Sequence, residues 1–208
     1  MDQPHPLSAR GSRDTPPGWS YNPSAWRERG PLLALATIGL LAALYTALSQ
    51  LGVVGAMVDP FFGSASSYAV THSEIARLLP VPDGVLGVVG YCCELLFGAI
   101  GGARRWRTRP WAVLIFALVI LALGMVSLAL TILQGAVIGS WCTVCLISAA
   151  VSTLILGLGI GEALASLQYL ALVRMKAGGA AAWRALWGAM PARTRERVAP
   201  APGVTVGR

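Results

Sequence analysis

Two cysteines separated by two residues, Cys142 and Cys145, stand at the start of a long apolar stretch and are the residues best suited to chemistry in this chain. Residues three apart lie on the same face of a helix, so the two sulfurs can meet within one turn. The positive end of a helix also favours the thiolate form of a cysteine at its N-terminus. The spacing therefore predicts a reversible dithiol/disulfide that accepts electrons from a thiol and delivers them to a lipid-soluble acceptor.

Two other interpretations of this pair are open. Free cysteines are among the most often buried residues, so the pair could serve packing alone. Half of a zinc site is disfavoured, because the chain offers no second Cys/His pair to complete a tetrahedron. We therefore expect no bound metal.

The composition is that of a membrane protein. Of the 208 residues, 55% are hydrophobic and 12% are charged, and the mean hydropathy is +0.65. The net charge of +7 does not indicate nucleic-acid binding, because the basic residues flank apolar stretches and form no patch interleaved with aromatic side chains. The first apolar stretch is preceded by about 30 polar residues and exceeds the length of a signal-peptide core, so we expect no cleaved signal peptide.

Four apolar stretches are long enough for transmembrane helices, at 31–58, 85–103, 111–138 and 141–164. They predict an all-α integral membrane four-helix bundle, with helix continuing as far as residue 173. Residues 1–30 are rich in Pro, Gly, Ser and Arg without apolar periodicity, which predicts a disordered tail. Residues 174–208 form a second, basic tail.

A polar loop, residues 59–84, separates the first two predicted helices. Ser73 is suited to cap a short amphipathic turn that carries Ile75, Leu78 and Leu79. We expect this turn to lie on the membrane as a lid; the alternative is a solvated loop. Asp83, at the end of the loop, is expected to cap the second membrane helix.

The basic residues are distributed unequally between the two sides of such a bundle. Fifteen of the sixteen Lys and Arg residues lie in the two tails and in the loop between the second and third predicted helices; only Arg77 lies on the other side. The positive-inside rule then places both termini in the cytoplasm and the lid loop outside. Cys142 and Cys145 would face the extracytoplasmic side of a plasma-membrane protein, an oxidising compartment.

Three adjacent residues in the second predicted helix carry further potential chemistry. Cys92 and Cys93 diverge on a helix, so a disulfide between them would be strained. Vicinal cysteines occur in membrane mercury carriers, which leaves metal handling as an alternative to simple packing. Glu94 would be costly as a charge near mid-membrane, so we expect it to face the bundle, protonated or paired, as a helix-to-helix hydrogen bond or a proton relay. Glu162, near the inner end of the last helix, is assigned no function.

The four predicted helices, the outer loop, the pattern Pro82-Asp83-x-x-x-Gly87-x-x-x-Tyr91 and Cys142-x-x-Cys145 together resemble the vitamin K epoxide reductase family. The resemblance covers about residues 31–170, within a predicted membrane domain of residues 31–173. The resemblance implies a four-helix bundle around a quinone pocket, in which quinones are reduced or reoxidised at the expense of thiols. By position, Cys145 would face a menaquinone- or ubiquinone-like co-substrate. Cys142 would exchange electrons with a thioredoxin-like thiol protein on the outer side.

The resemblance also implies a set of quinone-binding residues. Asp83 stands where the family often has a polar residue that contacts the quinone oxygen. On the fourth helix, Ser148 and Ser152 continue the line of the two cysteines at helical spacing, and we expect this stripe to line an apolar cavity beneath the lid. The predicted quinone-binding residues are Asp83, Gly87, Tyr91, Ser148 and Ala149.

The chain departs from the family pattern in two places. Family members usually carry two cysteines in the outer loop that shuttle electrons from the partner, whereas residues 59–84 contain none, and Ser67 stands about where one is expected. Ala149 occupies a position that is often tyrosine. A partner thiol is therefore expected to attack the disulfide directly, at Cys142, or else to use Cys92 or Cys93; we favour direct attack, because Cys92 should lie deeper, in apolar surroundings that disfavour the thiolate. The alternatives are a metal-handling membrane protein and a non-catalytic relative of the family.

Overall fold

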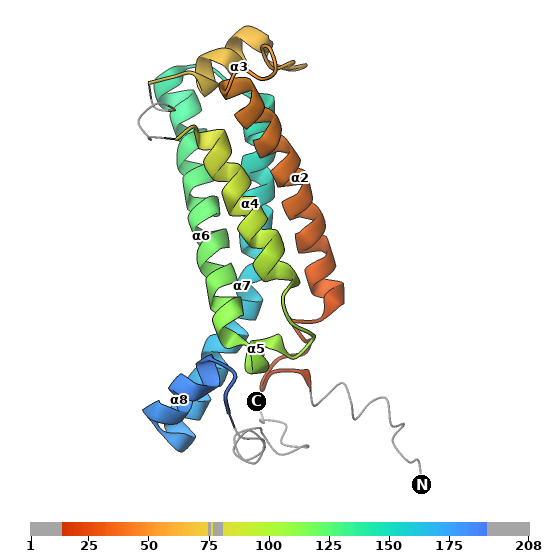
Figure 1. Cartoon of the computed structure of the whole chain (residues 1–208), viewed down its shortest axis with the longest axis vertical. Helices are drawn as coiled ribbons and strands as arrows, with labels where there is room; N and C mark the ends of the chain where they lie inside the picture. The colour runs from red at the N-terminus through yellow and green to blue at the C-terminus, as the bar shows by residue number, and fades with distance from the viewer. Residues whose placement is uncertain (1–13, 75, 77–80, 191–208) are drawn as a thin grey trace. The chain divides into compact units, whose positions relative to one another are not determined.

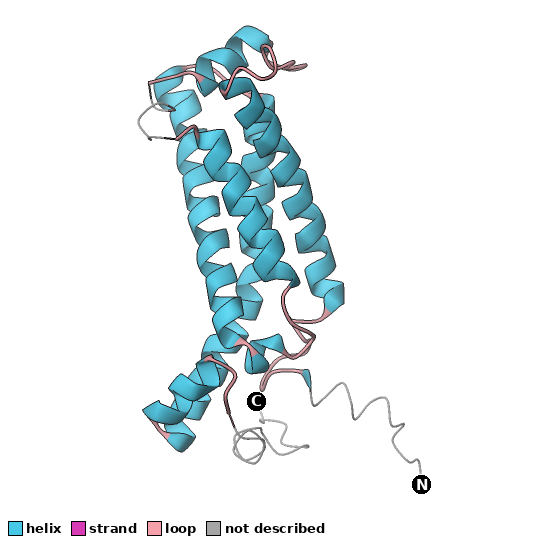
Figure 2. Cartoon of the chain, in the orientation of Figure 1, coloured by secondary structure: helices cyan, strands magenta, loops and turns pink. Residues whose placement is uncertain are grey.

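The computed structural model describes residues 14–74, 76 and 81–190, and every regular element in them is helical (Figures 1 and 2). The elements are α2 (Trp26–Gln50), α3 (Ser64–Thr71), α4 (Asp83–Ala99), α5 (Arg105–Thr108), α6 (Pro110–Leu133), the π-helical segment η1 (Gln134–Ile138), α7 (Thr143–Ala177) and α8 (Gly179–Leu186). The prediction of an all-α protein is confirmed, because the described residues contain no strand.

Within the described residues, three helical stretches are long and apolar enough to cross a membrane: Trp26–Gln50, Pro110–Ile138 and Thr143–Ala177. The second predicted crossing corresponds to α4, which has 17 residues and therefore lies at the short end of transmembrane helix lengths. Large aliphatic side chains point outward from these helices, among them Leu41, Leu118, Ile132, Leu154 and Leu158. Apolar surface on this scale belongs in lipid rather than water, so the chain is a membrane protein.

Two helices end earlier in the chain than hydropathy predicted, and a glycine follows each of these ends. The first helix was predicted to reach residue 58, but α2 ends at Gln50, because Gly52 adopts a φ of 72° and the Val53 N–H turns back to donate to the Leu48 carbonyl. Gly101, with a φ of 88°, follows the end of α4 in the same way. A left-handed residue of this kind stops the helix without a steric penalty only when it is glycine.

The chain forms two compact units. The bundle unit comprises Gly30–Ala99 and Phe116–Gly159, and the tail unit comprises Met1–Arg29, Ile100–Ile115 and Ile160–Arg208. In the bundle unit, segments of α2, α4, α6 and α7 lie side by side (Figure 1). Their shared core consists of Leu32, Ala36, Ala43, Tyr91, Phe116, Ile120, Val151 and Ile155. A Cβ added at Gly39 would overlap the Tyr91 ring, so glycine is what allows α2 and α4 to approach closely there.

The N-terminal part of the tail unit is packed. The indole N–H of Trp19 donates to Gln168 Oε1 at 2.8 Å, and the Asn22 amide donates to the Ala103 carbonyl at 2.7 Å. The prediction of a disordered tail is therefore wrong for residues 14–29, and residues 1–13 lie outside the described part of the chain. Order comes here from hydrogen bonds to distant segments, which composition does not reveal.

The C-terminal part of the tail unit continues as helix. The last long helix was predicted to end between residues 164 and 173, but α7 runs to Ala177; Gly178, with a φ of 83°, then separates it from α8. Residues 174–190 of the predicted basic tail are thus largely helical, and residues 191–208 lie outside the described residues. The core of this unit includes Trp106, Tyr169, Val173, Ala181 and Ala185.

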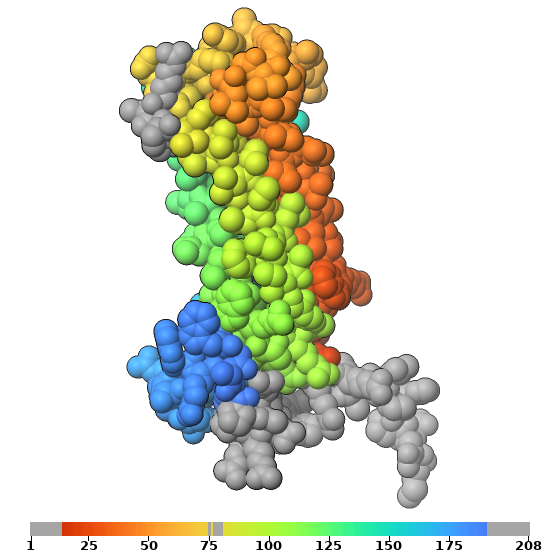
Figure 3. All heavy atoms as spheres, viewed as in Figure 1, coloured from red at the N-terminus to blue at the C-terminus, as the bar shows by residue number. Residues whose placement is uncertain are grey.

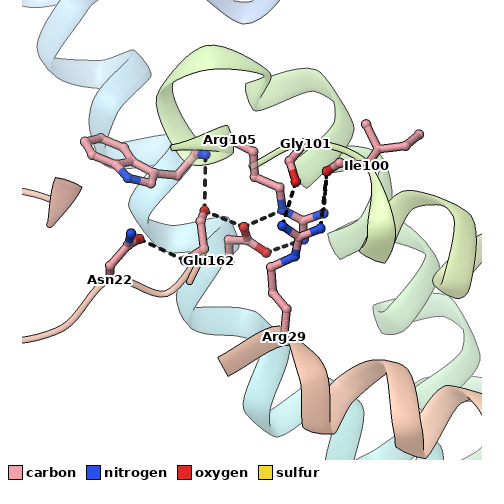
Figure 4. A network of polar contacts seen from close by, with 8 residues as sticks. Asn22, Arg29, Ile100, Gly101, Arg105 and Glu162 are labelled. Carbon is pink, nitrogen blue, oxygen red and sulfur yellow. Dashed lines mark hydrogen bonds and ion pairs between the residues drawn. The ribbon is translucent and has the colours of Figure 1, made fainter. Parts of the chain in front are cut away.

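A buried ionic cluster joins three segments of the tail unit (Figure 4). Arg105 donates through two guanidinium nitrogens to the carboxylate of Glu162, and both side chains are buried. The Ser24 hydroxyl donates to the same carboxylate at 2.5 Å, and Arg29 donates to the Gly101 carbonyl at 2.8 Å. Glu162, which was assigned no function, therefore has a structural one: a buried carboxylate is tolerated when it is paired and hydrogen-bonded.

Candidate functional site

The disulfide lies at the N-terminus of α7. Cys142 and Cys145 are joined, with Cα atoms 5.3 Å apart, as the spacing predicted. Cys142 immediately precedes the first residue of the helix, and its Sγ accepts a hydrogen bond from the Cys145 backbone N–H at 3.2 Å. The sulfur thus occupies the position of an N-cap side chain. After reduction, the same N–H would stabilise a Cys142 thiolate.

The sulfur of Cys142 is enclosed. Cys142 is 0% exposed and packs with Met57 and Val70, while Cys145 is only partly buried. We call the segment that covers Cys142, residues 57–71 including α3, the cover. The prediction that a partner attacks Cys142 directly treated it as the outer, accessible sulfur. In this structure a protein thiol reaches Cys142 only when the cover moves.

Asp59 fastens the cover to the first residue of α7. Its Oδ1 accepts hydrogen bonds from the N–H groups of Phe61 (3.0 Å) and Phe62 (2.9 Å) and from the Thr143 hydroxyl (2.6 Å). Its Oδ2 accepts from the Thr143 N–H (2.8 Å) and the Ser67 hydroxyl (2.5 Å). Burial by itself would raise the pKa of the Asp59 carboxyl, but these hydrogen bonds outweigh it and hold the pKa well below its usual range. Asp59 is therefore a fixed negative charge beside the disulfide.

Two serines add further hydrogen bonds to the cover. The Ser66 hydroxyl donates to the Trp141 carbonyl at 2.7 Å and accepts from the Trp141 N–H at 3.0 Å. Ser67, predicted to stand where a loop cysteine is expected, is buried against Asp59. Hydroxyl groups therefore connect this loop to the start of α7, where a sulfur was expected from the family pattern.

Sequence reasoning missed both α3 and the role of Asp59. The run Asp59-Pro60-Phe61-Phe62-Gly63 does contain a signal, because Asp followed by Pro favours a turn in which the side chain accepts nearby backbone N–H groups. That signal accounts for the two phenylalanine contacts. It says nothing of Thr143, which lies 84 residues further along the chain.

A hydrogen bond from η1, the segment that follows α6, holds the backbone of Cys142. The Cys142 N–H donates to Gln134 Oε1 at 3.2 Å, and the Gln134 side chain is buried. Gln134 is the first residue of η1, whose last residue is followed by Gly139 with a φ of 65°. The backbone of Cys142 is thereby held from α6 while Asp59 holds the next residue from the cover.

The structure brings together two of the predicted quinone-site residues, Tyr91 and Ser148, with Ser152 of the serine stripe. The Tyr91 hydroxyl lies 3.0 Å from Ser148 Oγ and 2.7 Å from Ser152 Oγ, and it donates to the Ser148 carbonyl at 2.9 Å. Tyr91 is 1% exposed, and Ala149 is half-buried beside Ser148. Ser148 is three residues from Cys145, so these hydroxyls continue the face of α7 that carries the disulfide.

Asp83 and Gly87 serve packing and capping. Asp83 Oδ1 accepts from the Gln50 side chain and from the Gly84 N–H, the latter at 3.0 Å. A Cβ added at Gly87 would lie 3.1 Å from the Ala43 Cβ, so α4 packs tightly against α2 at this point. The Gln50 side chain that contacts Asp83 also lines a cavity of about 320 Å³. The other lining residues are Ser49, Gly52, Val54, Gly55, Ala56, Tyr68 and His72.

Glu94 lies one helical turn beyond Tyr91, on the same buried face of α4. It is 1% exposed, and neither carboxylate oxygen has a hydrogen-bond partner among the described residues. The expectation that it faces the bundle is confirmed, whereas the expected helix-to-helix hydrogen bond is not formed. A carboxyl group enclosed by apolar side chains is stable only in its neutral form.

The vicinal cysteines stand apart from the disulfide chemistry. Cys92 is exposed on α4 and Cys93 is half-buried, and both thiols are free. Among the described residues, no three His, Cys, Asp or Glu side chains lie close enough together to hold a metal ion. The structure therefore adds no support to the metal-handling alternative.

The sequence matches the model of a known protein family. The family model described as the vitamin K epoxide reductase family matches residues 31–160, a range that contains both cysteines of the disulfide, the cover and Tyr91. No curated protein matches the chain.

Proposed function

Because the chain belongs to the vitamin K epoxide reductase family, whose members are membrane thiol–quinone oxidoreductases, we propose that its Cys142–Cys145 pair exchanges electrons with a lipid quinone. The observation that carries this proposal is the disulfide at the start of α7, with the Tyr91, Ser148 and Ser152 hydroxyls on the helix face that continues from it. It combines a redox pair with polar groups suited to a quinone carbonyl inside an apolar bundle.

The reaction has two balanced steps. A thiolate of a thioredoxin-like dithiol partner attacks Cys142, breaking the Cys142–Cys145 bond and forming a mixed disulfide; the partner's second thiol then resolves it, so that the partner is oxidised and both cysteines are reduced. In the second step the two thiols return to the disulfide while two electrons and two protons pass to the quinone, giving the quinol. The same steps run in reverse when quinol is the donor.

We assign the two cysteines different tasks. Cys145 lies nearer to Ser148 along α7 and is the sulfur that faces the quinone. Attack of the partner thiol on Cys142 releases the Cys145 thiolate. The Cys145 N–H that contacts Cys142 Sγ would then favour release of the Cys142 thiolate when the partner's second thiol resolves the mixed disulfide. This assignment requires the cover to open during each exchange with the partner.

The proposed quinone site comprises Asp83, Gly87, Tyr91, Ser148 and Ala149. Tyr91 is the central member, because its hydroxyl can turn from the Ser148 carbonyl to a quinone oxygen. Ala149, half-buried on α7 next to Ser148 in the sequence, is the small residue of the proposed site. Asp83 would act through Gln50, which also lines the cavity near the end of α2.

The proposed setting is a plasma membrane, with four crossings, both termini in the cytoplasm and the disulfide on the extracytoplasmic side. The distribution of Lys and Arg supports this orientation, since fifteen of sixteen lie in segments that share one side of such a bundle. The described helices are long enough for three of the crossings, and α4 would make the fourth.

The test uses the purified full-length protein in lipid nanodiscs, reduced and freed of reductant. Added menaquinone or ubiquinone analogue should remove two titratable thiols per chain and yield one equivalent of quinol. A variant with Cys92 and Cys93 changed to alanine should behave in the same way, whereas Cys142→Ser should not. If quinone leaves the thiol titre of the reduced protein unchanged, the chain is a non-catalytic member of its family.

A further inference from the structure

Three tryptophans meet in the tail unit. The Trp187 ring stacks on Trp111, with centroids 6.3 Å apart, and the edge of Trp183 meets Trp187 at 5.9 Å. Trp183 and Trp187 nevertheless remain 62% and 53% exposed. Aromatic surface of this size, gathered in one place, marks a contact with something outside the unit.

Helix α8, which carries Trp183 and ends just before Trp187, has two unlike faces. Ala181 and Ala185 are buried in the core of the tail unit beside Trp106 and Tyr169. Trp183 and Trp187 are four residues apart and so share another face, which is turned outward. In the space-filling view α8, in blue, lies at the surface of its unit (Figure 3).

The position of Trp111 at the start of a membrane-length helix indicates where this exposed face lies relative to the bilayer. It is the second residue of α6, where the apolar span Pro110–Ile138 begins. The first turn of a membrane-crossing helix lies where hydrocarbon gives way to headgroups, and tryptophan is enriched at that level. Since Trp187 stacks on Trp111, the C-terminal end of α8 is held at the same level.

The charged residues of this stretch of the chain are all basic. Residues 163–190 contain Arg174, Lys176 and Arg184 and no Asp or Glu. Arg184 lies next to Trp183 on α8, and the other two lie in the last turn of α7. Basic side chains beside interfacial aromatic rings attract anionic headgroups.

We infer that α8 is an interfacial membrane anchor, in which Trp183 and Trp187 insert among lipid headgroups and Arg184 binds an anionic phospholipid headgroup. The occupant of the exposed face is thus the surface of the bilayer that α6 enters at Trp111. This role is separate from the redox chemistry of the disulfide.

The depth of the rings can be measured in the full-length protein reconstituted into vesicles. Lipids brominated near the headgroup should quench the tryptophan emission, and the quenchable part should fall in a Trp183→Phe/Trp187→Phe variant. Trp106→Phe, which removes a buried ring, is the matched control and should leave that part unchanged. If the emission lost in the double variant is instead quenched by aqueous iodide and not by brominated lipid, the rings face water or a soluble partner and the anchor is refuted.

The charge can be tested by native mass spectrometry of protein released from vesicles that contain phosphatidylglycerol and phosphatidylcholine. Arg184→Gln should lower retention of phosphatidylglycerol by roughly fivefold, as expected for one basic residue at an anionic surface. The control Arg27→Gln changes an exposed arginine on a different helix and should have less effect. Equal losses in both variants, or none in either, would show that α8 does not bind the headgroup.

Discussion

Replacing Asp59 tests whether a loop carboxylate controls access to the disulfide. Asp59 accepts five hydrogen bonds, three of them from Ser67 and Thr143. Asp59→Ala removes all of them and leaves the Thr143 N–H and the Ser67 hydroxyl without their acceptor. Asp59→Asn keeps one carbonyl oxygen but directs an NH₂ group at a donor.

The expected loss of stability of the closed cover can be worked out from these hydrogen bonds. A buried polar group without its partner costs about 1–3 kcal/mol, and loss of a helix cap costs ~0.5–2 kcal/mol. Because water can refill part of the site, we expect Asp59→Ala to destabilise the closed cover by about 3 kcal/mol and Asp59→Asn by about 1–2 kcal/mol. Ser67→Ala, which removes one hydrogen bond, is the matched control at about 1 kcal/mol.

The assay is the rate at which a small thiol reduces the Cys142–Cys145 disulfide, measured beside unfolding in detergent. Because Cys142 is fully enclosed, reduction at Cys142 samples the open cover. A loss of 3 kcal/mol makes that state about a hundredfold more populated, so reduction of Asp59→Ala should be faster by up to that factor. Equal reduction rates in wild type and Asp59→Ala would refute the idea that Asp59 holds the cover.

The stability difference between wild type and Asp59→Ala should depend on pH in a direction set by the pKa of Asp59. The pKa of Asp59 is lower in the folded protein than its ordinary value of about 3.9. Its contribution to stability is therefore complete above that ordinary value and is lost as the pH falls through the lowered one. The difference in unfolding free energy between wild type and Asp59→Ala should be constant above about pH 5 and should shrink only in stronger acid.

Three further results are expected. Cys145→Ser should accumulate a partner adduct on Cys142 and Cys142→Ser should accumulate none there, as seen on non-reducing gels; an adduct elsewhere would exclude Cys142 as the site of attack. Glu94→Leu should raise the free energy of unfolding by ~1–3 kcal/mol, since it removes a buried carboxyl without partners, and unchanged quinone turnover in this variant would exclude a catalytic role for the carboxyl. In intact cells, an impermeant thiol reagent applied after reduction should label the Cys142–Cys145 pair, with Cys142 reacting as the cover opens; labelling only after the membrane is opened would reverse the proposed orientation.

The bundle and the disulfide could be predicted because their signals are local. Long apolar stretches identify membrane helices, and two cysteines three residues apart can bond within one helical turn. The cover could not be predicted in this way. α3, with the sequence Ser-Ala-Ser-Ser-Tyr-Ala-Val-Thr, has little apolar periodicity, and its attachment to Thr143 depends on a carboxylate 84 residues away.

In the tail unit, composition alone fails to predict which residues are ordered. Residues 14–29 have the composition of a disordered segment, yet single side chains such as Trp19 and Ser24 find partners on α7. The Arg105–Glu162 pair was within reach of sequence reasoning, because an acidic residue within a membrane helix needs a partner and a basic loop lies at the same end of the predicted bundle. The partner itself, 57 residues away, is a property of the fold.

The π-helical turn at the end of α6 makes the disulfide site sensitive to the number of residues as well as to their identity. Gln134, the first residue of that turn, accepts the amide hydrogen of Cys142 eight positions later. Deleting one residue between them would restore regular α-helical winding and swing Gln134 by about 100° around the helix axis. Among homologous chains, the distance from this glutamine to the first cysteine should therefore vary less than the residues between them, and a gap at this point would mark a homologue that has lost this support.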